Sequence, residues 1–206
     1  MQFKSSQFSN NLGAILMQRK EAEASIKPIK KASELDRSEQ ITILLAQSYQ
    51  KQSQWSNAIS EYEKLNLDSS QNKLIQMSYG ICLMEAGMNE KAMAAFHCAI
   101  ELDQNLVGAW GNIGEIHRRE GRSQEALEAT KKTLLLDPNN TDIYLNLGII
   151  YIGLSKLDQA LNSTLKSIEM NPNKANAYIN LGYIYKHLGK LDQALNSTLK
   201  SIEMNP

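Results

Sequence analysis

Apolar and small residues recur along the chain every 34 positions, and within each unit they follow the period of a helix. Windows that open at Glu39, Lys73, Val107, Thr141 and Ala175 align without an insertion. Position 7 of each window is large: Leu45, Tyr79, Ile113, Leu147 and Leu181. Position 8 is small: Ala46, Gly80, Gly114, Gly148 and Gly182. Position 20 is alanine throughout: Ala58, Ala92, Ala126, Ala160 and Ala194. Positions 4, 7, 8 and 11 share one helical face, and positions 20, 24 and 27 share another. Each unit therefore predicts two helices whose backbones lie close together.

Between the two helical stretches of each unit stands a residue that favours a break: Ser53, Gly87, Gly121, Ser155 and Gly189. Three units close on a proline, at Pro138, Pro172 and Pro206, which ends the second helix. The segment KLDQALNSTLKSIEMNP even occurs twice without change, at Lys156–Pro172 and Lys190–Pro206. The pattern predicts a series of helical hairpins.

We divide the chain into five regular units, at 39–72, 73–106, 107–140, 141–174 and 175–206, preceded by an irregular first unit at 1–38. Placing Ser6 at position 1 of that first unit puts Leu12 at position 7 and Gly13 at position 8. Pro28 then falls inside its second helix, where it should kink or shorten the helix.

The alternation of large, small and aromatic positions, closed by proline, resembles the tetratricopeptide repeat. The resemblance covers residues 39–206 without a gap. It implies an all-α fold, a right-handed superhelical solenoid of antiparallel helix pairs in which the first helices line a concave groove. Threonine and serine replace larger or apolar residues at positions 24 and 27 of the last three units, which predicts looser packing there: Thr130, Thr164, Thr198, Thr133, Ser167 and Ser201.

The chain has 22 basic and 22 acidic residues, so its zero net charge argues against a nucleic-acid partner. Its apolar runs are too short for a signal peptide or a membrane span, and we expect a cytoplasmic protein that does not bind membranes. Cys82 and Cys98 lack metal-ligand spacing and are expected to be reduced and packed in the core.

Catalytic and metal-binding motifs are absent from the sequence. None of the three histidines marks a convincing site: His97 lies on a second helix, His117 replaces a packing aromatic residue at position 11, and His187 has no carboxylate at ligand spacing. Glu115 and Arg119 have the i,i+4 spacing of a surface ion pair. We therefore predict no enzyme activity, no metal and no cofactor.

The groove that the resemblance implies offers a candidate binding site. Asparagine occupies position 6 at Asn11, Asn112, Asn146 and Asn180, whereas Leu44 and Ser78 interrupt the series. An amide both donates and accepts hydrogen bonds, which suits the backbone of an extended peptide. The arrangement resembles the asparagine ladder of O-linked N-acetylglucosamine transferases. The alternative is that these asparagines are merely tolerated groove lining.

Other groove residues add charge and an aromatic ring, so our predicted peptide site also includes Glu115, Arg119, Tyr183 and Lys186. Position 5 carries no lysine, which argues against the carboxylate clamp of some relatives in the family. The main functional hypothesis is a scaffold that binds a protein or extended peptide in its groove. The alternative is the substrate-recruiting arm of a larger enzyme, such as a glycosyltransferase or sulfotransferase, whose catalytic domain lies beyond Pro206.

The duplicated segment makes a further prediction about the last helix. Leu161, Leu165 and Ile168 of the inner copy should meet the next hairpin, whereas Leu195, Leu199 and Ile202 of the outer copy should have nothing over them. An uncapped apolar end favours association. We therefore expect either a longer array or end-to-end self-association.

Overall fold

The computed structural model describes residues 11, 13, 22–35, 38–67 and 72–204. Over these residues it contains eleven helices and no strand. The predicted all-α class is therefore confirmed. The chain also divides into two compact halves, each larger than a single 34-residue repeat. From here on, unit 1 means residues 1–106 and unit 2 means residues 107–206.

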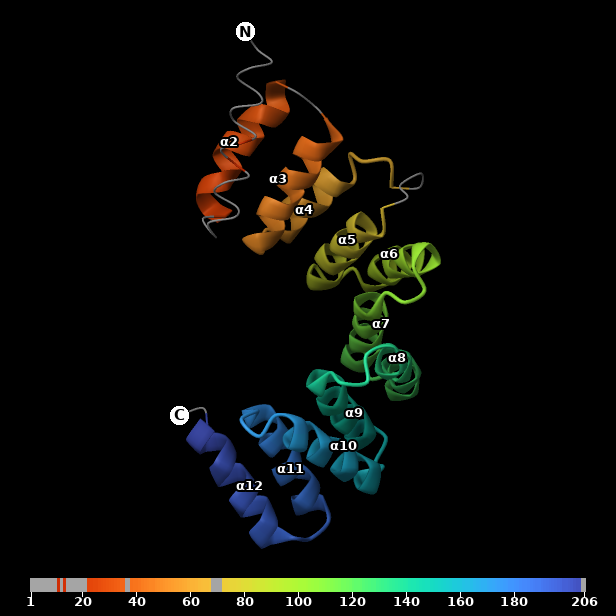
Figure 1. Ribbon diagram of the computed structural model, residues 1–206, viewed down its shortest axis with the longest axis vertical. Coiled ribbons are helices and arrows are strands. Elements are labelled where there is room, and N and C mark those ends of the chain that lie inside the picture. The colour runs from red at the N-terminus through yellow and green to blue at the C-terminus, as the bar shows by residue number, and fades with distance from the viewer. Residues whose placement is uncertain (1–10, 12, 14–21, 36–37, 68–71, 205–206) are drawn as a thin grey trace. The chain divides into compact units, whose positions relative to one another are not determined.

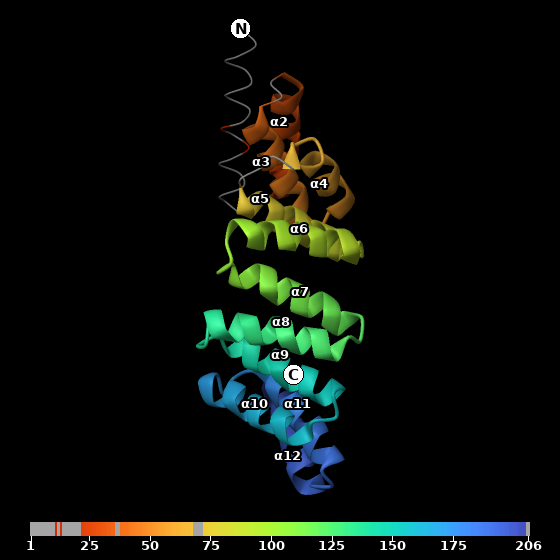
Figure 2. The same cartoon turned by 90° about the vertical axis from the view of Figure 1, so that its right-hand side faces the viewer.

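Each unit is a run of helices in which every helix packs against the next one in the sequence (Figure 1). Unit 1 contains α2 (Ala22–Leu35), α3 (Glu39–Lys51), α4 (Trp55–Tyr62), α5 (Lys73–Glu85) and α6 (Asn89–Leu102). Unit 2 contains α7 (Val107–Arg119), α8 (Ser123–Leu136), α9 (Thr141–Gly153), α10 (Leu157–Met170), α11 (Ala175–His187) and α12 (Leu191–Met204). In unit 2, α11 also contacts α9, so alternate helices lie next to each other as well. Figure 2 shows the helices of this unit succeeding one another in chain order.

Pro28 lies inside α2 without shortening it. The helix has 14 residues, the same length as α6, α8, α10 and α12. The predicted shortening is therefore not seen over the described residues, and the alternative, a kink, stays a prediction. Packing accounts for this, because Ile29 and Ala32 are fully buried against Ile41 and Leu45 of α3 and hold the helix in place.

The two helices of a pair are joined by the same tight turn in five places. At the end of α9, the Ser155 N–H donates to the Ile152 carbonyl at 2.9 Å, and the Lys156 N–H donates to the Tyr151 carbonyl at 2.9 Å. This pair of bonds is the Schellman motif, which requires a left-handed residue after the helix. The predicted break residues supply it, with φ of 55° at Ser53, 57° at Ser155, 78° at Gly87, and 73° at both Gly121 and Gly189.

Small residues at position 8 allow the two helices of a pair to approach closely. A Cβ atom on Gly80 would lie 2.6 Å from the Phe96 ring, and one on Gly182 would lie 2.8 Å from the Thr198 hydroxyl. In both pairs the residue that blocks the space occupies position 24. The predicted close approach of the backbones is confirmed.

The predicted looser packing around the threonines is correct only in part. Thr164 is fully buried, and its hydroxyl fills the space above Gly148, so α9 and α10 pack tightly there. A crevice of about 20 Å³ does open beside Thr130 and Thr133 of α8. That volume is about enough for one water molecule.

The two cysteines differ in burial. Cys82 is completely buried in α5, as predicted, but Cys98 is exposed on α6. The prediction for Cys98 is therefore wrong. Burial raises the pKa of the Cys82 thiol to about 12, because a thiolate would lose its hydration there.

Candidate functional site

The three predicted asparagines of unit 2 occupy the same position on α7, α9 and α11. Asn146 is exposed, whereas Asn112 and Asn180 are half-buried. None of their side chains has a hydrogen-bond partner among the residues that the structure describes, and the Asn180 Nδ2 atom is itself buried. We call the side of α7, α9 and α11 that carries these residues the asparagine face.

A cluster of charges lies at the end of α7 on this face. The Glu115 carboxylate accepts two hydrogen bonds from the Arg118 guanidinium, at 2.8 and 2.7 Å, and one from Arg119 Nε at 2.7 Å. The predicted ion pair between Glu115 and Arg119 is confirmed, but the sequence analysis did not assign Arg118 to it. The hydrogen bond from Arg118, followed by the one from Arg119, holds the pKa of Glu115 below its usual value.

Asn146 and the charge cluster meet at one place. The small crevice beside Thr130 is lined by Glu115 and Arg118 of α7 and by Asn146 and Ile150 of α9. The structure therefore brings an unengaged amide, a carboxylate and a guanidinium together on neighbouring helices. Such a group offers both hydrogen-bond donors and acceptors to a bound molecule.

The end of the asparagine face on α11 is more apolar. Ile179 and Tyr183 are 55% and 47% exposed, and the Tyr183 ring lies 4.3 Å from the His187 ring, centroid to centroid. Lys186 is exposed beside them. An exposed aromatic pair next to a cation is a surface that can contact both apolar and acidic groups.

Asn11 is the one predicted site residue that lies in unit 1. It is exposed and helical. At position 6 of α3 and α5 the chain has Leu44 and Ser78, both half-buried. The continuous series of asparagines is thus confined to unit 2.

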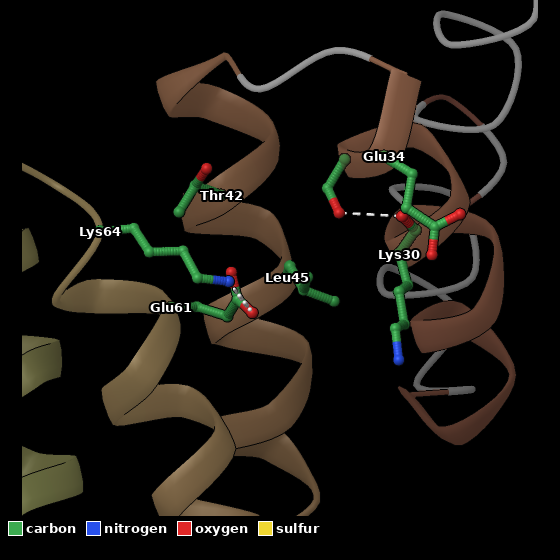
Figure 3. A pocket seen from close by; sticks show the side chains of 7 residues that line it. Lys30, Glu34, Thr42, Leu45, Glu61 and Lys64 are labelled. Carbon is green, nitrogen blue, oxygen red and sulfur yellow. Dashed lines mark hydrogen bonds and ion pairs between the residues drawn. The ribbon is translucent and has the colours of Figure 1, made fainter.

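Unit 1 contains a cleft that sequence analysis did not anticipate (Figure 3). It has a volume of about 640 Å³ and is lined by Lys30, Ser33 and Glu34 of α2, Thr42 and Leu45 of α3, and Glu61 and Lys64 at the end of α4. The Lys64 ammonium lies 2.6 Å from the Glu61 carboxylate, so these two charges neutralise each other. With charges of both signs along its walls, the cleft favours no particular class of ligand.

The residues that the structure describes contain no group of three or more histidine, cysteine or acidic side chains that could hold a metal ion. No helix among them has both the length and the apolar character that crossing a membrane requires.

Family models match most of unit 2. Residues 107–140 match one tetratricopeptide repeat model, and residues 129–162 and 164–196 match another. Residues 107–162 and 164–196 are therefore tetratricopeptide repeats. Their helix pairs, their left-handed turns and their small residues at positions 8 and 20 are the structural counterpart of that assignment.

Solved structures with the same fold include two that cover most of the chain. PilF from Pseudomonas aeruginosa is 21% identical, with a TM-score of 0.78, and the match covers all of this chain and 94% of that one. A crystal structure of MamA is 22% identical, with a TM-score of 0.71 over 80% of this chain and 90% of that one. At such identities the likeness concerns the fold. No curated protein sequence matches the chain.

Proposed function

We propose that this protein is a scaffold that binds an extended polypeptide along the asparagine face of unit 2. Tetratricopeptide repeats generally mediate contacts between proteins. The observation that carries the proposal is that Asn112, Asn146 and Asn180, on three first helices, have no hydrogen-bond partner within the described chain. A peptide backbone presents alternating N–H and C=O groups, and carboxamides can pair with both.

The energetics of the asparagines support a role in binding. A buried polar atom without a partner destabilises a structure by about 1–3 kcal/mol. The Nδ2 atom of Asn180 is in that state in the free protein. After a rotation of the side chain, a peptide carbonyl could accept a hydrogen bond from this amide in place of a water molecule.

The charges on the face favour a peptide with acidic residues at one edge. Arg118 and Arg119 of α7 and Lys186 of α11 all lie in the last turns of their helices, and Glu115 is the acidic partner of the two arginines. Three cations against one anion leave a net positive edge. Acidic side chains on the peptide would therefore increase the rate of association.

The proposal is tested with fluorescent 15-residue peptides of randomised sequence, half of them enriched in aspartate and glutamate. The test variant replaces Asn112, Asn146 and Asn180 with alanine. A matched control replaces three exposed asparagines that lie away from the face, Asn139, Asn162 and Asn196. If each amide contributes about 1 kcal/mol, the triple test variant should bind about 100-fold more weakly.

The control variant should bind like the parent, and both variants should keep the parent's helical circular dichroism. Equal binding by the test variant and the control would show that the asparagines are only groove lining. If the preference for acidic peptides did not change when Arg119 and Lys186 were replaced by glutamine, the proposed role of the charges would be wrong. The proposed role of the asparagines would not be affected.

A further inference from the structure

The crevice beside Thr130 is lined by two polar side chains that have no partner in the described part of the chain. It lies between α7, α8 and α9, and it opens on the asparagine face, where Asn146 is exposed. Thr130 of α8 lines its inner side and is only 6% exposed. Neither the Thr130 hydroxyl nor the Asn146 amide makes a hydrogen bond to a residue that the structure describes. Because buried polar groups are nearly always hydrogen-bonded, this hydroxyl indicates that the crevice takes a polar occupant.

The other lining residues leave the hydroxyl and the amide as the groups that an occupant can bind. Glu115 and Arg118 are already paired with each other. The Thr133 hydroxyl donates to a backbone carbonyl of its own helix at 3.0 Å. Ile143 and Ile150 of α9 add apolar side chains to the lining. The crevice therefore combines one free hydroxyl and one free carboxamide with apolar walls.

Gly111 of α7 keeps the crevice open. The equivalent residue is large and apolar in the other regular repeats: Ile43, Met77, Leu145 and Ile179. The packing of the helices does not require glycine here, because a Cβ atom would meet its nearest neighbour, a methyl group of Thr133, at 3.9 Å. Glycine also makes a helix less stable than alanine does. The effect of glycine at this position is thus to give access to the hydroxyl and the amide.

The size of the crevice limits what can enter it. Its volume is about 20 Å³, and a water molecule needs roughly 10–15 Å³ and at least two polar partners. A ligand group that displaces a bound water loses affinity unless it forms the same hydrogen bonds. The hydroxyl of serine is as small as water and both donates and accepts hydrogen bonds. Alanine has no such group, and the side chains that are larger than threonine do not fit.

We propose that the crevice is a specificity pocket for a serine of the polypeptide that binds along the asparagine face. The serine hydroxyl takes the place of a water molecule and bonds to the Thr130 hydroxyl and the Asn146 amide, and its methylene group stays at the mouth of the crevice. This inference rests on the proposed function, because it names one residue of the proposed ligand. It gives Thr130 and Gly111 a role in choosing the ligand.

The test uses two fluorescent 15-residue peptides and the full chain. In the first peptide, serine alternates with glutamine or aspartate, and in the second, alanine replaces every serine. Since serine occupies every second position, a shift of one residue always brings a serine to the crevice. We expect the parent to bind the serine peptide about three- to tenfold more tightly than the alanine peptide, the ratio that one hydrogen bond provides.

Two variants remove the pocket in different ways. Thr130→Val deletes the hydroxyl and keeps the shape of the side chain. Gly111→Leu fills the crevice with the residue that α9 carries at the equivalent position. Each variant should bind the two peptides equally. Because the two changes lie on different helices, a variant that failed to keep the parent's helical circular dichroism would leave the other to decide.

The matched control is Thr164→Val. Thr164 is the equivalent residue of α10, and its buried hydroxyl also has no partner among the described residues. It fills the space above Gly148, however, and is not among the residues that line the crevice. This variant should keep the parent's preference for serine.

The possible outcomes separate this inference from the proposed function. If the parent binds both peptides equally well, or if a folded Thr130→Val or Gly111→Leu variant keeps the preference, the serine pocket is wrong and peptide binding stands. If the parent binds neither of these peptides and none of the randomised ones, the proposed function is wrong and this inference falls with it.

Discussion

The hydroxyl oxygen of Thr164 lies 2.5 Å from the point that a Cβ atom on Gly148 would occupy. Real Cβ atoms essentially never come so close to another atom, so α9 and α10 can pack as they do only with glycine at this position. Gly111 of α7 is different, because a Cβ atom there would meet its nearest neighbour, a methyl group of Thr133, at 3.9 Å. The packing of the helices therefore requires glycine at position 148 but not at position 111.

Alanine at these two positions should have opposite effects on stability. Gly148→Ala should destabilise the protein by about 1–3 kcal/mol, because α9 and α10 must move apart. Gly111→Ala should stabilise it by up to about 1 kcal/mol, because alanine favours the helix and fits the space. Urea denaturation followed by circular dichroism measures both. A Gly148→Ala variant as stable as Gly111→Ala would contradict the packing described here.

Replacing Ser155, in the turn after α9, with glycine should make the protein more stable. Ser155 is exposed and has a φ of 57°, a conformation that disfavours residues with a Cβ atom. Ser155→Gly should raise the free energy of unfolding by about 0.5–1 kcal/mol, since the relief of strain exceeds the extra chain entropy of glycine. The reverse change at the equivalent turn, Gly189→Ser, should lower it by a similar amount. Thermal midpoints that move in the same direction in both variants would contradict this explanation.

The helices and their turns could be predicted because their signals are local and repeated. The break residues that sequence analysis identified are the ones with positive φ. An added Cβ atom would be crowded at each of the position-8 glycines Gly80, Gly114, Gly148 and Gly182. The exposure of Cys98 could also have been predicted from the sequence. Cys98 stands at position 26, outside the face formed by positions 20, 24 and 27.

Burial that depends on neighbouring helices could not be predicted in the same way. Leu195 and Ile202 are exposed as predicted, but Leu165 was expected to meet the next helix and is 41% exposed. Its twin Leu199 is 49% exposed, so the helix beside α10 hardly changes this position. Asn146 and Asn180 occupy the same position in their helices and still differ in exposure. Such differences arise from tertiary packing. A pattern of repeated residue types is the same in every repeat and so does not predict them.

The two cysteines should react differently with thiol reagents. At pH 8 the native protein should show one reactive thiol, Cys98, which is exposed. Cys82 should react only after unfolding, because it is buried and its pKa is raised to about 12. The number of thiols titrated by Ellman's reagent, with and without urea, checks this. In a Cys98→Ser variant the native protein should be unreactive, and rapid reaction of that variant would show that α5 opens readily.

The same buried thiol should make the protein less stable in alkali. The pKa of Cys82 is higher in the folded protein than in the unfolded chain, so the folded state binds more protons above about pH 8.5, where an ordinary thiol ionises. Its contribution to stability is complete below that pH and is lost as the pH rises toward 12. Cys82→Ala should flatten this alkaline fall in the free energy of unfolding relative to its own value at neutral pH, which urea titrations between pH 7 and 10.5 would measure.

The charge cluster on α7 should contribute stability that is lost in acid. The pKa of Glu115 is held below its usual value, first by the hydrogen bond from Arg118 and also by the one from Arg119. The unfolded chain therefore binds more protons than the folded protein as the pH falls below about 5. The contribution of the cluster is present above the ordinary glutamate pKa of about 4.3 and disappears as the pH falls through the lower, folded value. Because the groups are partly exposed, we expect it to be at most about 1 kcal/mol.

The comparison of Glu115→Gln with the parent isolates this contribution. The difference between their free energies of unfolding should be largest near pH 7 and should shrink as the pH falls through the lowered pKa of the folded carboxylate, because the parent's side chain is then protonated as well. Glu125→Gln, at an exposed position of α8, serves as the control. Salt at 1 M should reduce the difference at pH 7, because it screens partly exposed charges. A difference that stayed constant from pH 7 to pH 3 would mean that Glu115 acts through packing and not through its charge.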